Sequence, residues 1–259
     1  MRHDPRIHMN KAQELEERDW WDLWNTSHRS KDNNDEVSVE LFKHVAAIIR
    51  DLSQGQAKRI LEVACGTGTL SRQLEFSSYH GLDISPAAIG IASSKAARLS
   101  PPEGTERPTY ELADVHDWPL PSRLFDVAVC VDAVAYFRDQ QLALNKIARV
   151  LTPSGQLVLT TINPFVYNRI RRTAQNPLKE GSIRRWLSRA ELHDLITSAR
   201  LRIERSYTIM PRGQMGILRI INSRKLNHAL GDRAEQTFRR CKEQIGLGQY
   251  RVVVAGKRE

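Results

Sequence analysis

Short runs of apolar residues recur along the first 163 residues, and most are followed by a segment with apolar positions at helical spacing. Each run ends at a polar or glycine-containing turn. This pattern is typical of a parallel sheet whose strands are buried under helices on both faces. Strands are predicted over residues 60–64, 79–83, 109–113, 125–130 and 156–162. Helices are predicted over residues 37–52, 69–74, 87–99 and 139–151.

Two further strands follow residue 163, and a long insertion comes before each of them. These strands are predicted over residues 201–210 and 249–255, with helices over 188–199 and 232–244. The insertions span residues 164–187 and 211–246. The pattern as a whole predicts an α/β fold with a doubly wound, seven-stranded, mostly parallel sheet and helices on both faces.

The N-terminal segment is predicted to be a helix followed by a hydrophilic linker. Asn10 is a candidate N-cap, and the glutamates that follow it suit the positive end of a helix dipole. This helix ends in a tryptophan-rich stretch that includes Trp20, Trp21 and Trp24, and the linker covers residues 28–35. We therefore divide the chain into a cap and linker (1–35), a core (36–163) and a C-terminal part of the same domain (164–259).

The segment that says most about function is Cys65-Gly66-Thr67-Gly68, directly after the first predicted strand. Glycine lacks a Cβ and tolerates positive φ, so the backbone of such a loop approaches a ligand closely. In doubly wound folds this position binds nucleotide-like cofactors. Asp83 ends the second strand 17 residues after Gly66, near the roughly 20-residue spacing at which a carboxylate reaches ribose hydroxyls.

Two other kinds of glycine-loop site fit the sequence less well. A nicotinamide or flavin site requires a third glycine, and Ser71 stands at the corresponding position. Glu62, inside the first strand, would also have no function beneath a pyrophosphate. A phosphate-binding loop is excluded because no Gly-Lys-Ser or Gly-Lys-Thr follows the glycines.

Five motifs, all in order, carry a resemblance to a known family. They are Leu61-Glu-Val-Ala-Cys-Gly-Thr-Gly68, Gly81-Leu-Asp83-Ile-Ser, Ala113-Asp114-Val, Phe125-Asp126 and Leu151-Thr-Pro-Ser-Gly155. Residues 36–163 thereby resemble the class I S-adenosylmethionine-dependent methyltransferases. The final strands also fit that family's sheet, in which the last strand is antiparallel. Ala64 replaces the first glycine of the family's loop, and we expect this change to tighten the turn without abolishing it.

The resemblance implies that S-adenosyl-L-methionine is the cofactor and assigns residues to its parts. Asp83 would accept both ribose hydroxyls. The methionine end would be held by Glu62 and by the backbone of the loop, which comprises Ala64, Cys65, Gly66, Thr67 and Gly68.

The remaining assignments concern the adenine and the sulfonium. Ile84 would pack on the adenine, Asp114 would accept its amino group, and the Val115 amide would donate to the ring. Val131 would line the sulfonium. Apart from the resemblance, Trp20, Trp21 and Trp24 would either fold over the opening of the site or simply pack the N-terminal helix.

Methyl transfer from a sulfonium is an in-line displacement, so alignment and exclusion of water are the main catalytic tasks. A hydroxyl acceptor requires a general base, whereas an amine that is already neutral does not. We predict His116, Asp132 and Tyr136 as catalytic residues, with Asp117 as a further base candidate. The aromatic face of Tyr136 also suits a cationic methyl group. The eight histidines lack paired metal-ligand spacing, so no metal site is predicted.

Positive charge is concentrated in the C-terminal part of the chain. Residues 1–163 carry 18 Lys and Arg against 22 Asp and Glu, whereas residues 164–259 carry 21 against 8. Such an excess arises from solvated helix faces or from attraction to an anionic acceptor or partner. Only three cysteines occur, no 18-residue apolar run is present, and the N-terminus lacks an apolar signal core. We therefore expect a cytoplasmic protein without a membrane span.

These observations predict methyl transfer to an oxygen or nitrogen of a small or medium-sized acceptor. An RNA methyltransferase is one alternative, although few aromatic residues stand among the basic ones to stack on bases. A non-catalytic cofactor-binding partner protein is the other. Salt-sensitive RNA binding would identify the first alternative, and turnover with any acceptor would exclude the second.

Overall fold

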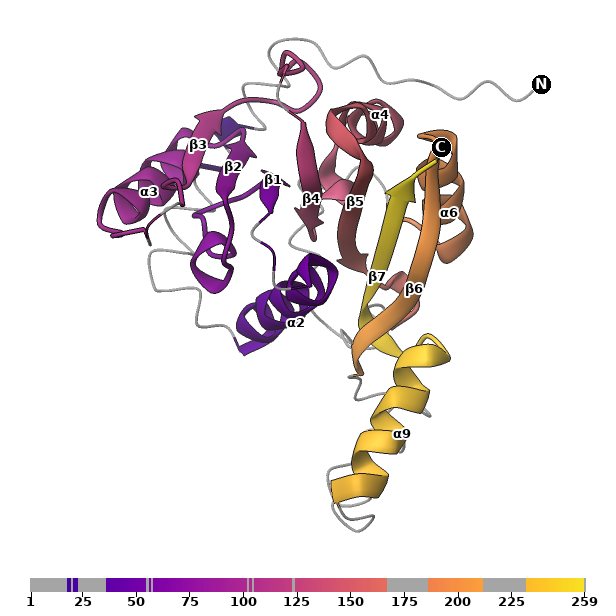
Figure 1. Cartoon of the computed structure of the whole chain (residues 1–259). Helices are drawn as coiled ribbons and strands as arrows, with labels where there is room; N and C mark the ends of the chain where they lie inside the picture. Colours follow the sequence, from indigo (N-terminus) through magenta and orange to yellow (C-terminus); the bar gives the residue numbers. More distant parts are fainter. Residues whose placement is uncertain are drawn as a thin grey trace, which may run out of the picture.

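The computed structural model describes the sheet and the helices that pack on it (Figure 1). The described residues are 18–19, 21–22, 36–54, 56, 58–101, 103, 105–122, 124–166, 186–211 and 232–258. The predicted linker over residues 28–35 lies outside them, as do most of the predicted N-terminal helix and most of the two insertions.

Seven strands form one sheet with the order β3-β2-β1-β4-β5-β7-β6. The strands are β1 (Arg59–Val63), β2 (Ser78–Asp83), β3 (Thr109–Leu112), β4 (Phe125–Val131), β5 (Leu151–Ile162), β6 (Leu201–Pro211) and β7 (Gly248–Lys257). The strands β1 to β5 pair in parallel, whereas β7 lies antiparallel between β5 and β6. The predicted doubly wound sheet with an antiparallel last strand is confirmed.

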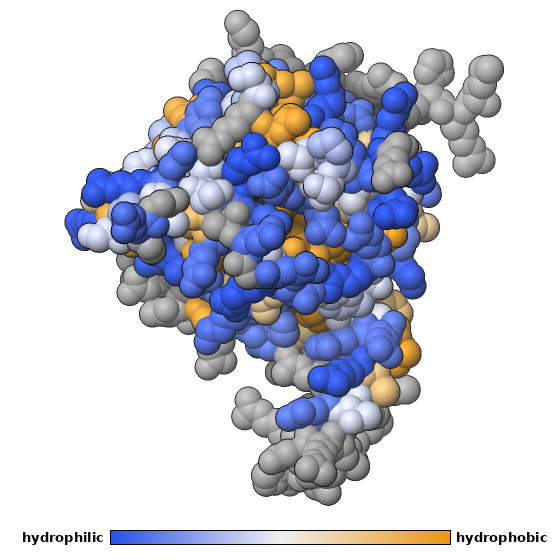
Figure 2. Space-filling model, in the orientation of Figure 1, coloured by the Kyte–Doolittle hydropathy of each residue, from blue (hydrophilic) through white to orange (hydrophobic). Residues whose placement is uncertain are grey.

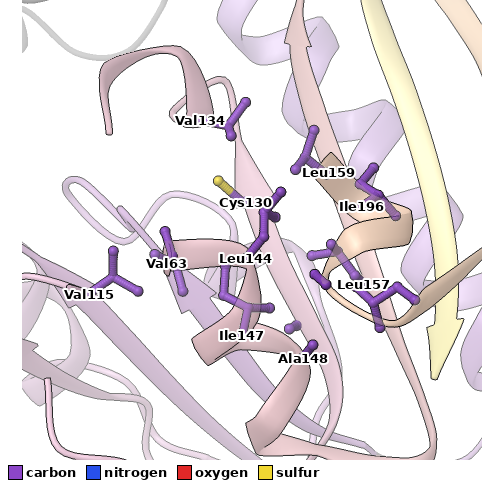
Figure 3. Packing of buried hydrophobic residues seen from close by; sticks show 14 of the residues in the cluster. Val63, Val115, Cys130, Val134, Leu144, Ile147, Ala148, Leu157, Leu159 and Ile196 are labelled. Atoms are coloured by element: carbon purple, nitrogen blue, oxygen red, sulfur yellow. The ribbon is translucent and has the colours of Figure 1, made fainter. Parts of the chain in front are cut away.

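The central strands are buried on both faces, which explains their continuous apolar runs. In β4, Ala128 and Cys130 belong to an apolar cluster shared with α4 (Gln140–Val150) and α6 (Arg189–Ser198), shown in Figure 3. Val127 and Val129 alternate with them and pack in a second cluster with α2 (Glu36–Ser53). The alternation of side chains along each strand therefore builds two cores, one on each face.

Polar side chains cap three of the helices at their first turns. Ser85 caps α3 (Pro86–Ala97), and Asp139 caps α4. Ser188 and Glu191 form a capping box at the start of α6. These side chains satisfy backbone N–H groups that have no partner inside the helix.

The outer surface is hydrophilic over most of the face in Figure 2, with small apolar patches between the polar side chains. The helix α9 (Asp232–Gln244) has the bounds that the sequence predicts, and it projects beyond the ends of β6 and β7 (Figure 1). None of the described helices is both long enough and apolar enough to cross a membrane.

The connection from β1 to β2 differs from the prediction. A helix is predicted over residues 69–74, but the chain forms turns and then the short 3-10 helix η1 (Ser71–Gln73). The Ser71 hydroxyl donates to the Gly68 carbonyl at 3.1 Å and lies 2.6 Å from the Tyr110 hydroxyl. Such side-chain bonds compete with the helical pattern at this point. The prediction of an α-helix here is wrong.

The start of the fifth strand also differs from the prediction. The sequence predicts a strand from residue 156, whereas β5 begins at Leu151, which pairs with Phe125. The register between β4 and β5 then shifts before the regular ladder continues. A Cβ at Gly155 would lie 3.0 Å from the Phe125 carbonyl oxygen, so the backbones approach closely at this irregularity.

The loop after β1 contains three residues with positive φ. These are Ala64 at 60°, Gly66 at 52° and Gly68 at 68°. Gly68 is also confined by its surroundings, since a Cβ there would lie 2.6 Å from the Tyr110 hydroxyl oxygen. Ala64 retains the turn although its left-handed conformation costs an alanine about 1–2 kcal/mol.

We expect opposite responses from two substitutions in this loop. Gly68→Ala should lower the free energy of unfolding by about 1–3 kcal/mol, because the added methyl group meets Tyr110 in a left-handed conformation. Ala64→Gly should leave the free energy of unfolding unchanged or raise it by up to about 1 kcal/mol. Relief of backbone strain stabilises the folded state, whereas the added glycine raises the entropy of the unfolded chain. Urea unfolding of both variants measures these changes. A stable Gly68→Ala variant would contradict the close packing of this loop.

Candidate functional site

A cleft opens at the carboxyl ends of the central strands, where the sheet order changes direction between β1 and β4. Doubly wound sheets bind their ligands at this position. The segments that follow β1, β2, β3 and β4 supply most of the walls of the cleft.

Asp83 connects the glycine loop to the end of β2. Its Oδ2 accepts a hydrogen bond from the Gly66 N–H at 2.7 Å, and its Oδ1 accepts one from the Ser85 N–H at 3.0 Å. The Cys65 N–H donates to the Leu82 carbonyl at 2.9 Å, so two consecutive loop residues are fixed to β2. The loop is therefore preorganised, with a carboxylate in the adjoining wall of the cleft.

Glu62 lies beneath the glycine loop, not in the cleft. It is 1% exposed and accepts a hydrogen bond from the Tyr79 hydroxyl. Because side chains alternate along β1, Val63 faces the cleft while Glu62 points to the other face of the sheet. Burial and the charge of Glu62 raise the pKa of Tyr79 well above its ordinary value. The tyrosine therefore remains protonated and continues to donate to Glu62.

A second acid, Asp114, stands in the wall after β3. The His116 N–H donates to its Oδ1 at 2.8 Å, the His116 Nδ1 lies 2.5 Å from the same oxygen, and Arg138 Nη2 lies 3.7 Å from its Oδ2. Burial alone would raise the pKa of Asp114, but the hydrogen bonds of His116 and the charge of Arg138 outweigh it and hold the pKa below its ordinary value. Asp114 is therefore ionised at neutral pH.

The ring of His116 is held at both nitrogens. Nδ1 faces Asp114, and Nε2 lies 3.1 Å from the Asp139 carbonyl oxygen and 3.2 Å from the Asp139 nitrogen. Because Asp114 is ionised, Nδ1 must carry a proton to bond to it, and Nε2 of such a neutral ring accepts the N–H of Asp139. This arrangement favours a positioning function for His116 over the predicted function as a general base.

Two residues from the N-terminal segment reach the mouth of the cleft. Trp21 lines the cleft and meets Tyr136 edge to face, with ring centroids 5.1 Å apart. The Asp22 carboxylate accepts hydrogen bonds from the Ser85 hydroxyl at 2.5 Å and from the Ala87 N–H at 3.1 Å. Asp22 thereby places a negative charge at the N-terminus of α3, where the helix dipole favours it.

The segment after β4 forms the opposite wall. Val131 ends the strand and Asp132 follows it with a φ of 50°. The Asp132 N–H donates to the carbonyl of Thr160 at 3.0 Å, which ties this bend to β5. A non-glycine residue in this conformation is uncommon, and such residues cluster at functional sites.

The cleft brings together most of the residues that the sequence predicts for the site. Those that line it are Ala64, Gly66, Asp83, Ile84, Asp114, Val115, His116, Val131, Asp132 and Tyr136. Glu62, Cys65 and Gly68 do not line it. Trp20 and Trp24 lie outside the described residues.

Cys65, in the glycine loop, and Cys130, in β4, are both buried, and neither lines the cleft. The Cys65 sulfur lies behind the loop, where a Cβ on Gly81 would approach it to 2.9 Å. Cys130 belongs to the apolar cluster in Figure 3, and burial raises its pKa to about 12. The Cys130 thiol is therefore protonated at neutral pH.

Residues 61–159 match the family model described as a methyltransferase domain. This match runs from β1 into β5, so it includes every wall of the cleft except Trp21. The chain carries a class I S-adenosylmethionine-dependent methyltransferase domain.

Curated relatives of this methyltransferase domain match part of the chain. The O-methyltransferase cnsE of Penicillium expansum is 32% identical over 114 residues, which are 43% of this chain and 40% of that protein. The phthiotriol/phenolphthiotriol dimycocerosates methyltransferase of Mycobacterium leprae is 28% identical over 169 residues, 60% of this chain and 58% of that protein. The chain thus spans about half the length of these relatives.

Solved structures of methyltransferases have the same fold over nearly the whole chain. The N-methyltransferase NodS of Bradyrhizobium japonicum, in complex with S-adenosyl-L-homocysteine, has a TM-score of 0.59 at 17% identity and covers 97% of this chain and 100% of that one. Magnesium protoporphyrin IX methyltransferase of Synechocystis, with the same ligand bound, has a TM-score of 0.60 at 14% identity and covers 93% and 97%. At these identities the likeness shows the fold alone.

Arg138 in the methyltransferase cleft, and Asp22 beside it, were not among the residues predicted for the site. Arg138 gives no motif signal, because it follows β4 in an irregular segment. Asp22 reaches Ser85 across 63 positions of the sequence, and no local pattern indicates such a contact. Trp21, by contrast, was named from the sequence with Trp20 and Trp24, and it lines the cleft.

The lowered pKa of Asp114 predicts how stability depends on pH. A carboxylate of this kind stabilises the fold above its unfolded pKa, and the contribution is lost as the pH falls through its lower folded pKa. The difference in the free energy of unfolding between the wild type and Asp114→Asn should therefore be largest near neutral pH and shrink below about pH 4. Urea unfolding at a series of pH values measures it.

Asp117→Asn is the matched control for this experiment. Asp117 pairs with the same Arg138 at 2.6 Å, but its side chain is 72% exposed, so its loss should cost little at any pH. If Asp114→Asn lowers the free energy of unfolding by the same amount at neutral and at acid pH, the pKa of Asp114 is not lowered by the fold.

Proposed function

We infer that this protein transfers the methyl group of S-adenosyl-L-methionine to an oxygen or nitrogen of a small or medium-sized acceptor. The observation that carries this proposal is the cleft itself, because a fixed glycine loop and two carboxylates converge there inside the matched methyltransferase domain. O-methyltransferases among the relatives and an N-methyltransferase among the solved structures support both acceptor atoms.

The two acids of the cleft would bind the two ends of an adenosine. Asp83 would accept the ribose hydroxyls, since each carboxylate oxygen can accept more than one hydrogen bond. Asp114 would accept the adenine amino group, Val115 would donate its amide to the ring, and Ile84 would pack on the ring face. All four of these residues line the cleft.

The methionine end of the cofactor would extend past the glycine loop toward β4. Gly66 lines the cleft there and lacks a side chain that would obstruct the ligand. Glu62 would act from beneath, by fixing the strand that leads into the loop, and Tyr79 would hold its carboxylate in place. Val131 and Asp132 would lie beside the sulfonium.

The chemistry would depend mainly on alignment and on exclusion of water. His116 is not proposed as the base, because both of its nitrogens are hydrogen bonded to protein groups. Trp21 and Tyr136 would cover the sulfonium and its methyl group, and aromatic faces stabilise such a cation by about 0.5–2 kcal/mol. The acceptor would bind among residues 1–35, 164–187 and 211–246, which lie largely outside the described residues.

A function other than methyl transfer is the alternative that a specific observation supports. The [4+2]-cyclase SpnF has the same fold, with a TM-score of 0.55 at 19% identity over 83% of this chain and 80% of that one. That protein is named as a cyclase, so the fold by itself does not specify methyl transfer. Transfer of a labelled methyl group from S-adenosyl-L-methionine to a component of a cell extract would decide in favour of the methyltransferase.

Substitution of Asp83 tests the cofactor assignment. Asp83→Asn should weaken binding of S-adenosyl-L-homocysteine by about 1–3 kcal/mol, because charge-assisted hydrogen bonds to the ribose become neutral. The asparagine keeps a similar shape, but its single amide oxygen can accept the N–H of Gly66 or that of Ser85, not both as arranged around Asp83. Calorimetry measures the affinity, and Asp126→Asn is the control, because Asp126 pairs with Arg59 at the opposite end of β4. Equal affinities for the wild type and Asp83→Asn would overturn the assignment.

The contact between Trp21 and Tyr136 predicts a coupling in ligand binding. We expect Trp21→Ala and Tyr136→Ala each to weaken binding of S-adenosyl-L-homocysteine, and the double variant to lose less than the sum. The expected coupling energy is about 0.5–1.5 kcal/mol, the usual value for an aromatic pair. Calorimetry on the four proteins of this double-mutant cycle measures it. Strict additivity would show that the N-terminal segment does not close on the bound ligand.

A further inference from the structure

Arg251 is a partly buried arginine in β7, close to the carboxyl end of β5. Its Nη2 donates to the Asn163 Oδ1 at 2.9 Å. Asn163 is fully buried, and its own amide donates to the carbonyls of Gly246 and Gly248, which fixes the orientation of the oxygen that holds Arg251. The Nε–H of Arg251 is buried and has no hydrogen-bond partner among the described residues. Burial of an unsatisfied charged donor is costly, so this guanidinium calls for an explanation.

The neighbours of Arg251 add to its charge. Arg189 begins α6 and His193 follows one turn later in the same helix. Burial and the charge of Arg189 lower the pKa of Arg251. Burial, together with the charges of Arg189 and Arg251, also lowers the pKa of His193, and only Asp194 opposes this change. Among the described residues, no carboxylate forms an ion pair with any of the three.

The other polar groups at this place do not neutralise the charge. His193 Nε2 lies 2.8 Å from the hydroxyl of Ser206 in β6, a neutral partner. Glu191, the nearest acid in the first turn of α6, is engaged in the capping box with Ser188. The three basic groups and Ser206 therefore form a positively charged cluster, here called the α6–β7 cluster.

The register of the sheet places the α6–β7 cluster beside the cleft. Arg251 pairs with Thr161 of β5, and the preceding residue, Thr160, pairs with Val131 of β4, which lines the cleft. Since neighbouring strands lie about 4.8 Å apart, the backbone of Arg251 is about 10 Å from that of Val131. In Figure 1, β4, β5 and β7 follow one another across the sheet. The cluster thus lies on the side of Val131 away from Asp83 and Asp114.

We propose that the α6–β7 cluster binds an anionic group, a carboxylate or a phosphate, of the molecule that accepts the methyl group. Arg251 supplies a guanidinium that Asn163 holds in a fixed orientation, and Arg189 and His193 supply further positive charge and donors. Charge-assisted hydrogen bonds of this kind recognise oxyanions. The acceptor would extend from this cluster, past β5, to the sulfonium beside Val131. The inference rests on the proposed function, because it names the class of acceptor for that site.

The test uses benzoate and inorganic phosphate as probes, with the neutral amide benzamide as the uncharged comparison for benzoate. Titrations are followed by the NMR signals of the histidine rings at constant ionic strength, with chloride replacing the probe. A bound anion stabilises the protonated ring, so the pKa of His193 should rise in the presence of a bound probe. Benzamide should leave that pKa unchanged.

Three variants show whether the response belongs to the α6–β7 cluster. Arg251→Gln and, separately, Arg189→Gln should weaken the response of His193 to the anionic probe at least about tenfold. Arg202→Gln is the matched control, because Arg202 is an arginine of β6 with a 71% exposed side chain and should bind no probe. The Arg189 variant keeps the test decisive if loss of Arg251 disturbs the fold.

The outcomes separate this inference from the proposed function. A saturable response to benzoate but not phosphate, or the reverse, assigns the anionic group of the acceptor as a carboxylate or a phosphate. No saturable response to either anion, or the same response in Arg251→Gln and Arg189→Gln, overturns the inference. Binding of S-adenosyl-L-homocysteine, measured by calorimetry on the same samples, tests the cofactor site independently, so loss of that binding would contradict the proposed function instead.

Discussion

The hydrogen bond from the Gly66 N–H to the Asp83 carboxylate is the contact on which the candidate site depends. It joins the loop after β1 to the end of β2 at 2.7 Å, and the same carboxylate accepts the Ser85 N–H at the start of α3. One side chain thereby positions a glycine loop, a strand end and a helix N-terminus. Ala64 holds the left-handed conformation that this geometry requires, although a glycine would adopt it with less strain. Substitution of Asp83 would therefore remove both the proposed contact to the ribose and the contact that shapes the loop.

Charge divides the carboxyl edge of the sheet into two regions. Carboxylates stand after β2 and β3, where Asp83 and Asp114 face the cleft, and arginines stand around β7 and α6, where Arg189 and Arg251 lie without an acidic partner among the described residues. The first region suits the hydroxyl and amino groups of a nucleoside, which donate hydrogen bonds. The second suits an oxyanion. The segment at the end of β4, with Val131 and Asp132, lies between the acidic and the basic region. A methyl group that passes from the proposed cofactor to the proposed acceptor would be transferred there.

The sequence predicts the parts of this structure that have local signals. Apolar runs ending in glycines or acids indicated the strands, and the spacing from Gly66 to Asp83 placed both at one edge of the sheet. The 3-10 turn at Ser71 was missed because it depends on the Tyr110 hydroxyl, 39 residues away. His116 was interpreted as a base from its position, and only the structure reveals that Asp114 and Asp139 occupy its nitrogens. The contacts of Asp22 and Arg251 join distant segments, so neither periodicity nor spacing could indicate them.

A crystal structure of the full chain with S-adenosyl-L-homocysteine would test the central claim most directly. The account predicts electron density in the cleft, with the ribose hydroxyls within hydrogen-bond distance of Asp83, the adenine amino group on Asp114 and the sulfur beside Val131. The glycine loop should hardly move, because its hydrogen bonds to β2 hold it in place. Ligand bound outside this cleft, or an adenosine turned so that neither carboxylate contacts it, would contradict the account.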